Sequence, residues 1–128
     1  MILRKYMSLL GIGSARIDLI LSKDTYKTGE HINGYYLING GTIEQQIKRI
    51  DCELIQMDHS KGIEKMIDTQ TISTTKLIES DELYKISFSF KLPTTLTVST
   101  DKISYRFNTK LTFNEGVESR DEDIIYII

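Results

Sequence analysis

The sequence predicts an all-β protein, an antiparallel β-sandwich of about seven strands, from two observations. In residues 83–114, apolar and polar side chains alternate with period two along two successive segments. Such alternation places one face of a strand on a core and the other in water. Turn-forming residues also recur at roughly 8–12-residue intervals along the chain. The apolar parity of residues 83–114 comprises Tyr84, Ile86, Phe88, Phe90 and Leu92, then Ile103, Tyr105, Phe107, Leu111 and Phe113.

Length and composition narrow the class of protein. At 128 residues, the chain has the size of one domain with its own hydrophobic core. The net charge of −2 argues against nucleic-acid binding, which normally leaves a basic footprint. The single cysteine, Cys52, excludes an intrachain disulfide and suits a reducing compartment, so we expect a cytoplasmic protein. No segment approaches the ~20 apolar residues of a transmembrane helix.

Residues 1–12 are predicted to form a short helix. Their apolar residues fall at helical spacing, so that one side of the helix is apolar. We expect this helix to pack on its own domain; contact with a membrane surface is the less favoured alternative. A signal peptide is disfavoured because the apolar run is short and interrupted. The apolar side consists of Leu3, Tyr6, Met7 and Leu10.

Two strands are predicted next, at residues 15–21 and 31–39. Within the second, Asn33-Gly34 resembles a hairpin turn, but too few residues separate it from Gly29 for a strand to fit between. We therefore place Gly34 inside a strand, at a bulge or a close backbone approach. The break between strands falls at Asn39-Gly40-Gly41.

Residues 44–57 are predicted to form a strand with Ile50, Cys52 and Leu54 facing inward. A helix over residues 42–57 is the alternative, because its isoleucines also match helical spacing. Residues 62–76 are rich in β-branched side chains but have no clearly apolar face, which predicts an edge strand or a solvated hairpin arm.

Pro93 ends the strand that precedes it, because proline cannot donate a hydrogen bond to a ladder. Residues 114–123 are predicted to form an acidic loop, and residues 124–128 a last strand. Residues 1–27 are basic in balance, whereas residues 115–128 are acidic. We expect the two ends to lie near each other and compensate; an acidic docking patch is the alternative.

Residues capable of catalysis are few. His31 and His59 lie far apart in the sequence, and one cysteine cannot build a sulfur metal site. Cys52 lies on an inward parity, which predicts a buried, inert thiol. Asp121-Glu122-Asp123 offers the oxygen ligands that calcium prefers, but it lacks the spacing of an EF-hand loop. We therefore expect no enzyme activity, no cofactor and no metal site.

Several segments together resemble a known family. Residues 14–54, SARIDLILSKDTYKTGEHINGYYLINGGTIEQQIKRIDCEL, look like the start of a bacterial sporulation-control protein of the SpoOM family. The Tyr26…Gly29-Glu30…Gly34 spacing, and ISFSFKLP followed by ISYRFNTKLTF, are similar to arrestin-like domains more widely. Other segments are closer to the SpoOM family itself: Gly11-Ile12-Gly13, Gly40-Gly41…Glu44-Gln45 and Asp121-Glu122-Asp123.

The resemblance implies an arrestin-like β-sandwich over residues 1–128 that acts by protein–protein interaction. It also implies a regulatory role in sporulation control in Gram-positive bacteria, and it carries no catalytic residues. Family members usually have a second arrestin-like half, and this chain resembles their first half.

Our leading hypothesis is therefore a regulatory or scaffold module that recruits an unidentified protein partner. The edge strand predicted at residues 62–76 is suited to β-augmentation, and homo-oligomerisation through the same edge is a related option. The alternative is a ligand- or carbohydrate-binding β-sandwich. The candidate interaction residues are Leu3, Tyr6, Met7, Leu10, Thr69, Thr71, Glu118, Asp121, Glu122 and Asp123.

Overall fold

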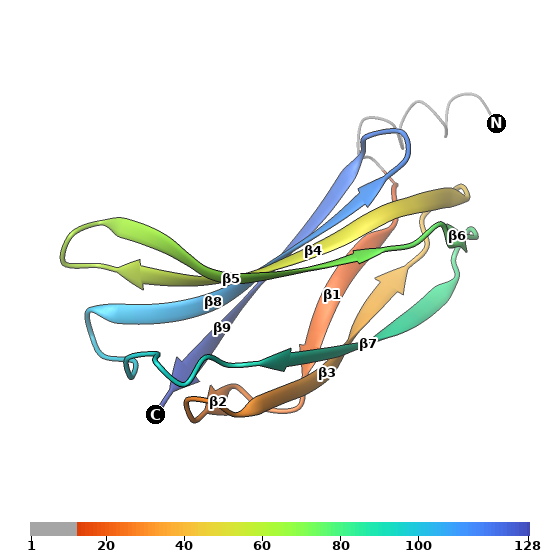
Figure 1. Ribbon diagram of the computed structural model, residues 1–128. Helices are drawn as coiled ribbons and strands as arrows, with labels where there is room; N and C mark the ends of the chain where they lie inside the picture. Colours follow the sequence, from red (N-terminus) through yellow and green to blue (C-terminus); the bar gives the residue numbers. More distant parts are fainter. Residues whose placement is uncertain (1–12) are drawn as a thin grey trace.

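A computed structural model describes residues 13–128, which form strands and turns without a helix (Figure 1). The predicted all-β class is therefore confirmed, whereas the predicted N-terminal helix lies outside the described residues. In chain order the strands are β1 Arg16–Leu21, β2 Thr25–Tyr26, β3 His31–Asn39, β4 Gln45–Asp58, β5 Ile63–Ser73, β6 Leu77–Ile78, β7 Leu83–Lys91, β8 Ile103–Phe113 and β9 Glu118–Ile127.

The strands form two sheets that enclose one core. The smaller sheet has the order β1-β3-β7, and the larger has the order β2-β9-β8-β4-β5, with β6 attached to β4. All pairs are antiparallel except β2 and β9, which run parallel. Besides the seven longer strands, β2 and β6 have two residues each, too short to be recognised as strands from sequence.

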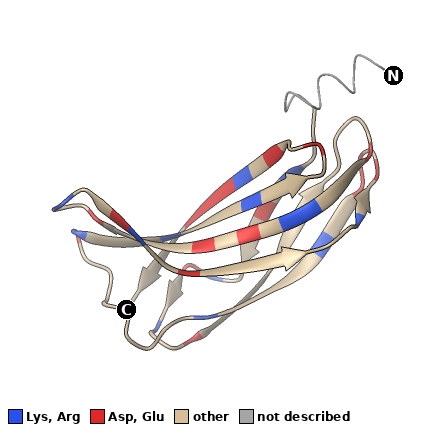
Figure 2. Ribbon diagram, turned by 45° about the horizontal axis from the view of Figure 1, so that its top comes forward, with Lys and Arg blue, Asp and Glu red and all other residues tan. Residues whose placement is uncertain are grey.

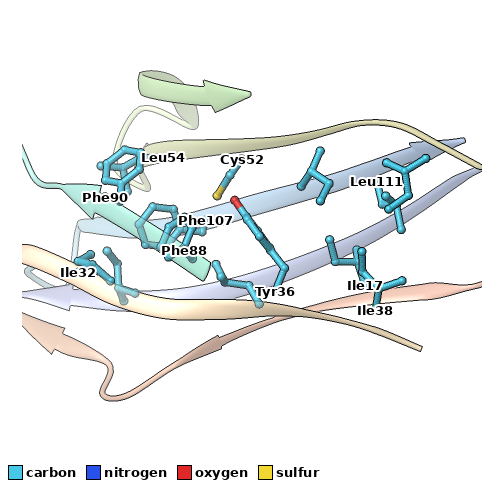
Figure 3. Close-up of a cluster of buried hydrophobic side chains, with 14 of the residues drawn as sticks. Ile17, Ile32, Tyr36, Ile38, Cys52, Leu54, Phe88, Phe90, Phe107 and Leu111 are labelled. Atoms are coloured by element: carbon cyan, nitrogen blue, oxygen red, sulfur yellow. The ribbon is translucent and has the colours of Figure 1, made fainter. Parts of the chain in front are cut away.

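The core is centred on aromatic rings from the two strands that show the clearest alternation. Phe107 of β8 packs edge-on against Phe88 and Phe90 of β7, with ring centroids 5.6 and 5.2 Å away (Figure 3). Tyr36 of β3 meets Phe88 edge-on at 5.3 Å. The two contacts of Phe107 join the two sheets, the contact of Tyr36 lies within the smaller sheet, and all three add stabilisation beyond the buried area. The predicted inward parity of residues 83–114 is confirmed.

Two glycines allow backbone segments to approach closely. A Cβ at Gly34 would lie 2.2 Å from the carbonyl oxygen of Ile20 on the neighbouring strand. A Cβ at Gly41 would lie 2.1 Å from the carbonyl oxygen of Gly13. Neither position has room for a side chain, which confirms the interpretation of Gly34 as a close backbone approach inside a strand.

The structure corrects two predictions. The alternative helix over residues 42–57 is wrong, because β4 pairs with β5 on one side and β8 on the other. The acidic loop over residues 114–123 is also wrong beyond its first residues, because β9 begins at Glu118. Only the short turn at Asn114–Gly116 precedes it. By contrast, β5 is the end strand of the larger sheet and mostly exposed, as predicted.

Candidate functional site

The two sides of the sandwich, where the edges of the sheets approach each other, are built differently. On the first, here called the covered side, β1 of the smaller sheet lies beside β9 of the larger (Figure 1). Three backbone N–H groups, two on the outer edge of β1 and one just before the strand begins, donate to side chains of the larger sheet. Ala15 N–H donates to Gln45 Oε1 at 2.8 Å, Ile17 N–H to Ser119 Oγ at 3.1 Å, and Leu19 N–H to Asp121 Oδ2 at 2.7 Å.

These contacts advance by two residues on both strands, so β1 runs parallel to β9 without forming a backbone ladder with it. After a short break, β2 takes up the same course and pairs with β9 through Thr25 and Tyr126. β1 and β2 therefore act as two parts of one interrupted strand, which passes from the smaller sheet to the larger. Side chains cover the edge where the backbones stay apart.

Asp123 is the next residue of β9 along this row of acceptors. Its Oδ2 atom is buried and has no hydrogen-bond partner among the described residues. The carboxylates of Asp18, Asp121 and Asp123 lie within 4.8 Å of one another. Burial, a hydrogen bond with Asp121 and repulsion from the neighbouring acids raise the pKa of Asp123 to about 7. Burial and Asp121 also raise the pKa of Asp18. The side chains of Asp18, Asp121 and Asp123 are called the carboxylate cluster below.

The carboxylate cluster differs from the acidic triplet singled out in the sequence. Glu122 is exposed on the opposite face of β9, and Asp18, from a strand 103 residues earlier, takes its place beside Asp121. Three carboxylates offer hard oxygen ligands of the kind that calcium accepts. An adjoining hollow of about 510 Å³ has Asp18, Lys23, Asp24 and Asp123 in its lining.

A second hollow, of about 320 Å³, lies on the outer face of the larger sheet. Charged residues of both signs cover this face (Figure 2). Among the described residues, no aromatic ring lines either hollow, and the carbohydrate-binding alternative requires exposed aromatic rings. The polar side chains of the second hollow include Asp51, Glu53, Asn108, Lys110, Arg120 and Glu122.

On the other side of the sandwich, here called the open side, β5 and β7 face each other as the end strands of their sheets. In the described part of the chain one hydrogen bond connects them, from Gln70 Nε2 to the carbonyl oxygen of Ser89 at 3.0 Å. Apolar side chains at this side are only half-buried against the core. They are Ile67 and Ile72 of β5 and Tyr84 and Ile86 of β7.

The predicted interaction residues are distributed over separate surfaces. Thr69 and Thr71 are exposed on β5, at the open side. Glu118 and Glu122 are exposed on the outer face of the larger sheet, whereas Asp121 and Asp123 turn toward β1. Leu3, Tyr6, Met7 and Leu10 lie outside the described residues. The structure therefore separates an acidic group that the sequence presented as one patch.

Cys52 is buried in the core, as predicted. Burial raises the pKa of its thiol to about 11, so the thiol stays protonated at neutral pH. The Tyr36 hydroxyl points toward the Cys52 sulfur (Figure 3). His59 lies on the exposed β4–β5 turn, where its Nε2 atom is 2.8 Å from Ser104 Oγ. This histidine is remote from both hollows described above.

Taken together, the fold and the covered side define a two-sheet β-sandwich domain with one sealed side and one open side. The family model described as SpoOM protein matches residues 3–128, and the chain belongs to this family. It is 28% identical over 130 residues to the sporulation-control protein spo0M of Bacillus subtilis (strain 168). The match covers 97% of this chain and 50% of the relative.

Solved structures agree with this assignment. The crystal structure of Spo0M from Bacillus subtilis matches with a TM-score of 0.80 and 29% identity, over 91% of this chain and 50% of that one. The chain therefore spans about half the length of the relatives it matches. A superoxide reductase (neelaredoxin) from Ignicoccus hospitalis matches with a TM-score of 0.54 at 11% identity, over 97% of this chain and 87% of that one, and shares the fold alone. Among the described residues no helix is long and apolar enough to cross a membrane.

Proposed function

We propose that this domain is a non-enzymatic regulatory module of the cytoplasm that recruits a protein partner through the open side of its sandwich. The name of its Bacillus subtilis relative suggests a role in sporulation control. The observation that carries the proposal is the contrast between the two sides. β1 is covered by three side-chain acceptors, whereas β5 and β7 are joined by one hydrogen bond.

The edge of β5 is suited to pairing with a strand from another protein. This edge strand has eleven residues, long enough for an extended segment to form several backbone hydrogen bonds. The N–H of Thr69 donates to the side chain of Asp68 at 2.8 Å, so it points away from β4. By the two-residue period of a strand, the N–H of Thr71 points the same way. Asp68 blunts the edge locally and leaves the stretch around Thr71 accessible.

Three observations support the absence of catalysis. The Cys52 thiol is held protonated in the core, and His59, which is paired with Ser104 of β8, is exposed on a turn and lines neither of the two hollows. Asp121 of the carboxylate cluster accepts a backbone hydrogen bond from Leu19 that covers β1, which is a structural task. The single cysteine also supports a cytoplasmic location.

The proposal is tested by immobilising the intact chain and capturing partners from a lysate of sporulating Bacillus subtilis, with Thr71→Pro as the comparison. Proline removes an N–H that faces away from β4, so the ladder with β4 is retained while the edge loses a donor. We expect a protein retained by the wild type and lost with Thr71→Pro. Circular dichroism confirms that the variant is folded.

Thr69→Ser, which keeps the backbone donor, is the matched control and should retain the partner. A partner that binds wild type and Thr71→Pro equally would contradict recruitment through β5. A second copy of the chain is the competing occupant of this edge, and light scattering of the purified protein identifies it as a dimer that Thr71→Pro dissociates.

A further inference from the structure

The second strand of the open side, β7, has an outer edge whose backbone forms no ladder with any other described strand. The residues that flank β7, Glu82 and Leu92, form backbone hydrogen bonds on the side of β3. Leu92 N–H donates to Glu30 O at 2.9 Å, and Glu82 O accepts from Gly40 N–H at 2.6 Å, so the even-numbered backbone groups of β7 face β3. The carbonyl of Ser89, by contrast, points outward and accepts from Gln70. The odd-numbered residues of β7 therefore direct their backbone groups away from β3, along the open side, and their side chains to the outer face of the sheet.

The side chains on this edge carry positive charge. Lys85 and Lys91 are exposed, and neither belongs to an ion pair among the described residues. Lys85 Nζ lies 4.7 Å from the centre of the Tyr35 ring on β3, which fixes its position on the outer face. Ser87 and Ser89, both exposed and small, lie between the two lysines and leave room for a neighbouring strand.

The outer face of the smaller sheet, to which the two lysines belong, is positively charged as a whole. It carries Arg16, Lys85 and Lys91 against Asp18, so three cations and one anion give +2. The whole chain has a net charge of −2, so this face has the opposite sign to the molecule. A second copy of the chain would bring the same cations against it, whereas an acidic partner is attracted to it.

We propose that the outer edge of β7 binds an extended protein segment with two acidic residues six positions apart and apolar residues at the alternate positions between them. This inference rests on the proposed function and names a second edge and a partner chemistry for it. The segment adds to β7 as a new edge strand of the smaller sheet. Its acidic side chains lie directly opposite Lys85 and Lys91, which are separated by 91 minus 85, or six, residues.

The apolar positions follow from the faces of the new strand. The apolar side chains at the second, fourth and sixth positions of the segment point inward, opposite Ile86, Phe88 and Phe90 of β7. Ile86 is half-buried, and Phe88 and Phe90 are buried, so the inward residues of the segment extend the core over the open side. Small polar residues suffice opposite Ser87 and Ser89. On binding, the hydrogen bond from Gln70 to the Ser89 carbonyl is replaced by a backbone hydrogen bond.

This arrangement favours a peptide over other anionic partners. Nucleic acids and lipid headgroups supply phosphates, but they have neither the backbone donors that the β7 edge requires nor the alternating apolar side chains. Lys85 and Lys91 are about 20 Å apart along β7, which is the distance that six residues of an extended peptide also span. An acidic peptide is therefore the occupant that can both pair with the two lysines and form hydrogen bonds with the backbone of the β7 edge.

The test measures fluorescence anisotropy of a labelled heptapeptide, DVSVSVE, titrated with the intact chain. We expect saturable binding that the charge-reversed peptide KVSVSVK does not show. The double variant Lys85→Glu/Lys91→Glu should weaken binding of DVSVSVE at least about tenfold and bind KVSVSVK instead. Arg16→Glu, on the same face but on β1, is the matched control and should leave binding within about twofold.

A backbone variant separates edge pairing from charge attraction alone. Ser87→Pro removes an N–H that faces away from β3, so it should abolish binding while thermal unfolding shows a folded domain. Binding that survives Ser87→Pro in the folded protein, or that Arg16→Glu weakens as much as the lysine reversals, would overturn the edge assignment. The absence of binding to either peptide would also overturn it.

The failure of the β7 inference and the failure of the proposed function can be told apart. If Thr71→Pro loses the captured partner but the lysine reversals leave DVSVSVE binding unchanged, recruitment through β5 stands and the β7 inference fails. If the heptapeptide binds as predicted and no partner depends on Thr71, the reverse holds. Both variants alter exposed residues of edge strands, so each protein is first compared with the wild type by circular dichroism.

Discussion

The covered and open sides of this sandwich differ in how their sheet edges are protected. Each side has two sheet edges with unpaired backbone groups. On the covered side, interior positions of β9 carry Ser119 and Asp121 instead of apolar residues, and these side chains bind the backbone of β1. On the open side, Gln70 supplies one such hydrogen bond, and apolar side chains remain half-buried.

This difference indicates which side stabilises the fold and which side is accessible to a partner. Polar residues at inward positions of β9 bury less apolar surface than apolar residues would, but their side chains cover the backbone edge of β1. This cover protects β1 against pairing with other chains. β5 and β7 lack this protection and keep their backbone groups available. We conclude that stability is concentrated on the covered side and accessible surface on the open side. The following predictions test this division, beginning with the largest effect.

Apolar truncation should cost much more at the covered side than at the open side. Ile17 of β1 is 5% exposed, so Ile17→Ala should lower the free energy of unfolding by about 2–5 kcal/mol through lost burial and a residual cavity. Ile86 of β7 is half-buried, so Ile86→Ala should cost about 1 kcal/mol. Urea denaturation measures both values. Equal losses would contradict the division.

Each side has a glutamine whose side chain forms a hydrogen bond between the two sheets, and replacing it should cause a smaller loss of stability than the apolar truncations. Gln45 is 3% exposed and accepts from Ala15 N–H, so Gln45→Met leaves a buried donor unpaired and should cost about 1–3 kcal/mol. Gln70→Met removes the bridge of the open side, where water replaces it, and should cost at most about 1 kcal/mol. Thermal unfolding of the two variants gives the ranking. The reverse order would show that the open side carries the greater share of stability.

The carboxylate cluster gives the covered side a pH dependence. The pKa of Asp123 rises from an ordinary value of 3.8 to about 7 in the folded protein. A raised carboxyl pKa contributes stability that is complete below about pH 4 and is lost as the pH rises toward 7. The raised pKa of Asp18 has the same sign. This contribution is superimposed on that of the other titrating groups.

Asp123→Asn should remove most of this slope and stabilise the protein at pH 8, because the amide holds no charge in the cluster. Chemical denaturation between pH 4 and pH 8 measures it, as the difference between variant and wild type. Glu122→Gln, on the exposed face of the same strand, is the control and should leave the slope nearly unchanged. A wild-type slope that persists in Asp123→Asn would place the titrating group elsewhere.

The sequence was most informative where a strand has one apolar and one polar face. β7 and β8 satisfy this condition, and their inward residues were predicted individually. Gly34 was placed correctly because too little chain separates it from Gly29 for a hairpin. The edge position of β5 also followed from its composition, because a strand without a clear apolar face cannot lie at the centre of a sandwich.

β9 was missed in its first half for a physical reason. Ser119, Asp121 and Asp123 occupy inward positions, so both faces of this segment are polar and no alternation signals a strand. Their role depends on β1, more than a hundred residues away, and local patterns contain no information about that contact. The carboxylate cluster was missed likewise, because Asp18 joins Asp121 only through the tertiary fold.

The contacts between β1 and β9 also affect how the chain folds during synthesis. Ile17 and Ser119, like Leu19 and Asp121, are separated by 102 residues, so the hydrogen bonds form only after nearly the whole described chain has been made. Closing so long a loop makes folding slow, on the millisecond-to-second scale typical of sandwiches. Until β9 leaves the ribosome, the outer edge of β1 lacks Ser119 and Asp121 as acceptors. The growing chain therefore passes through a stage at which both sides are exposed, and chaperone binding should be strongest at that stage.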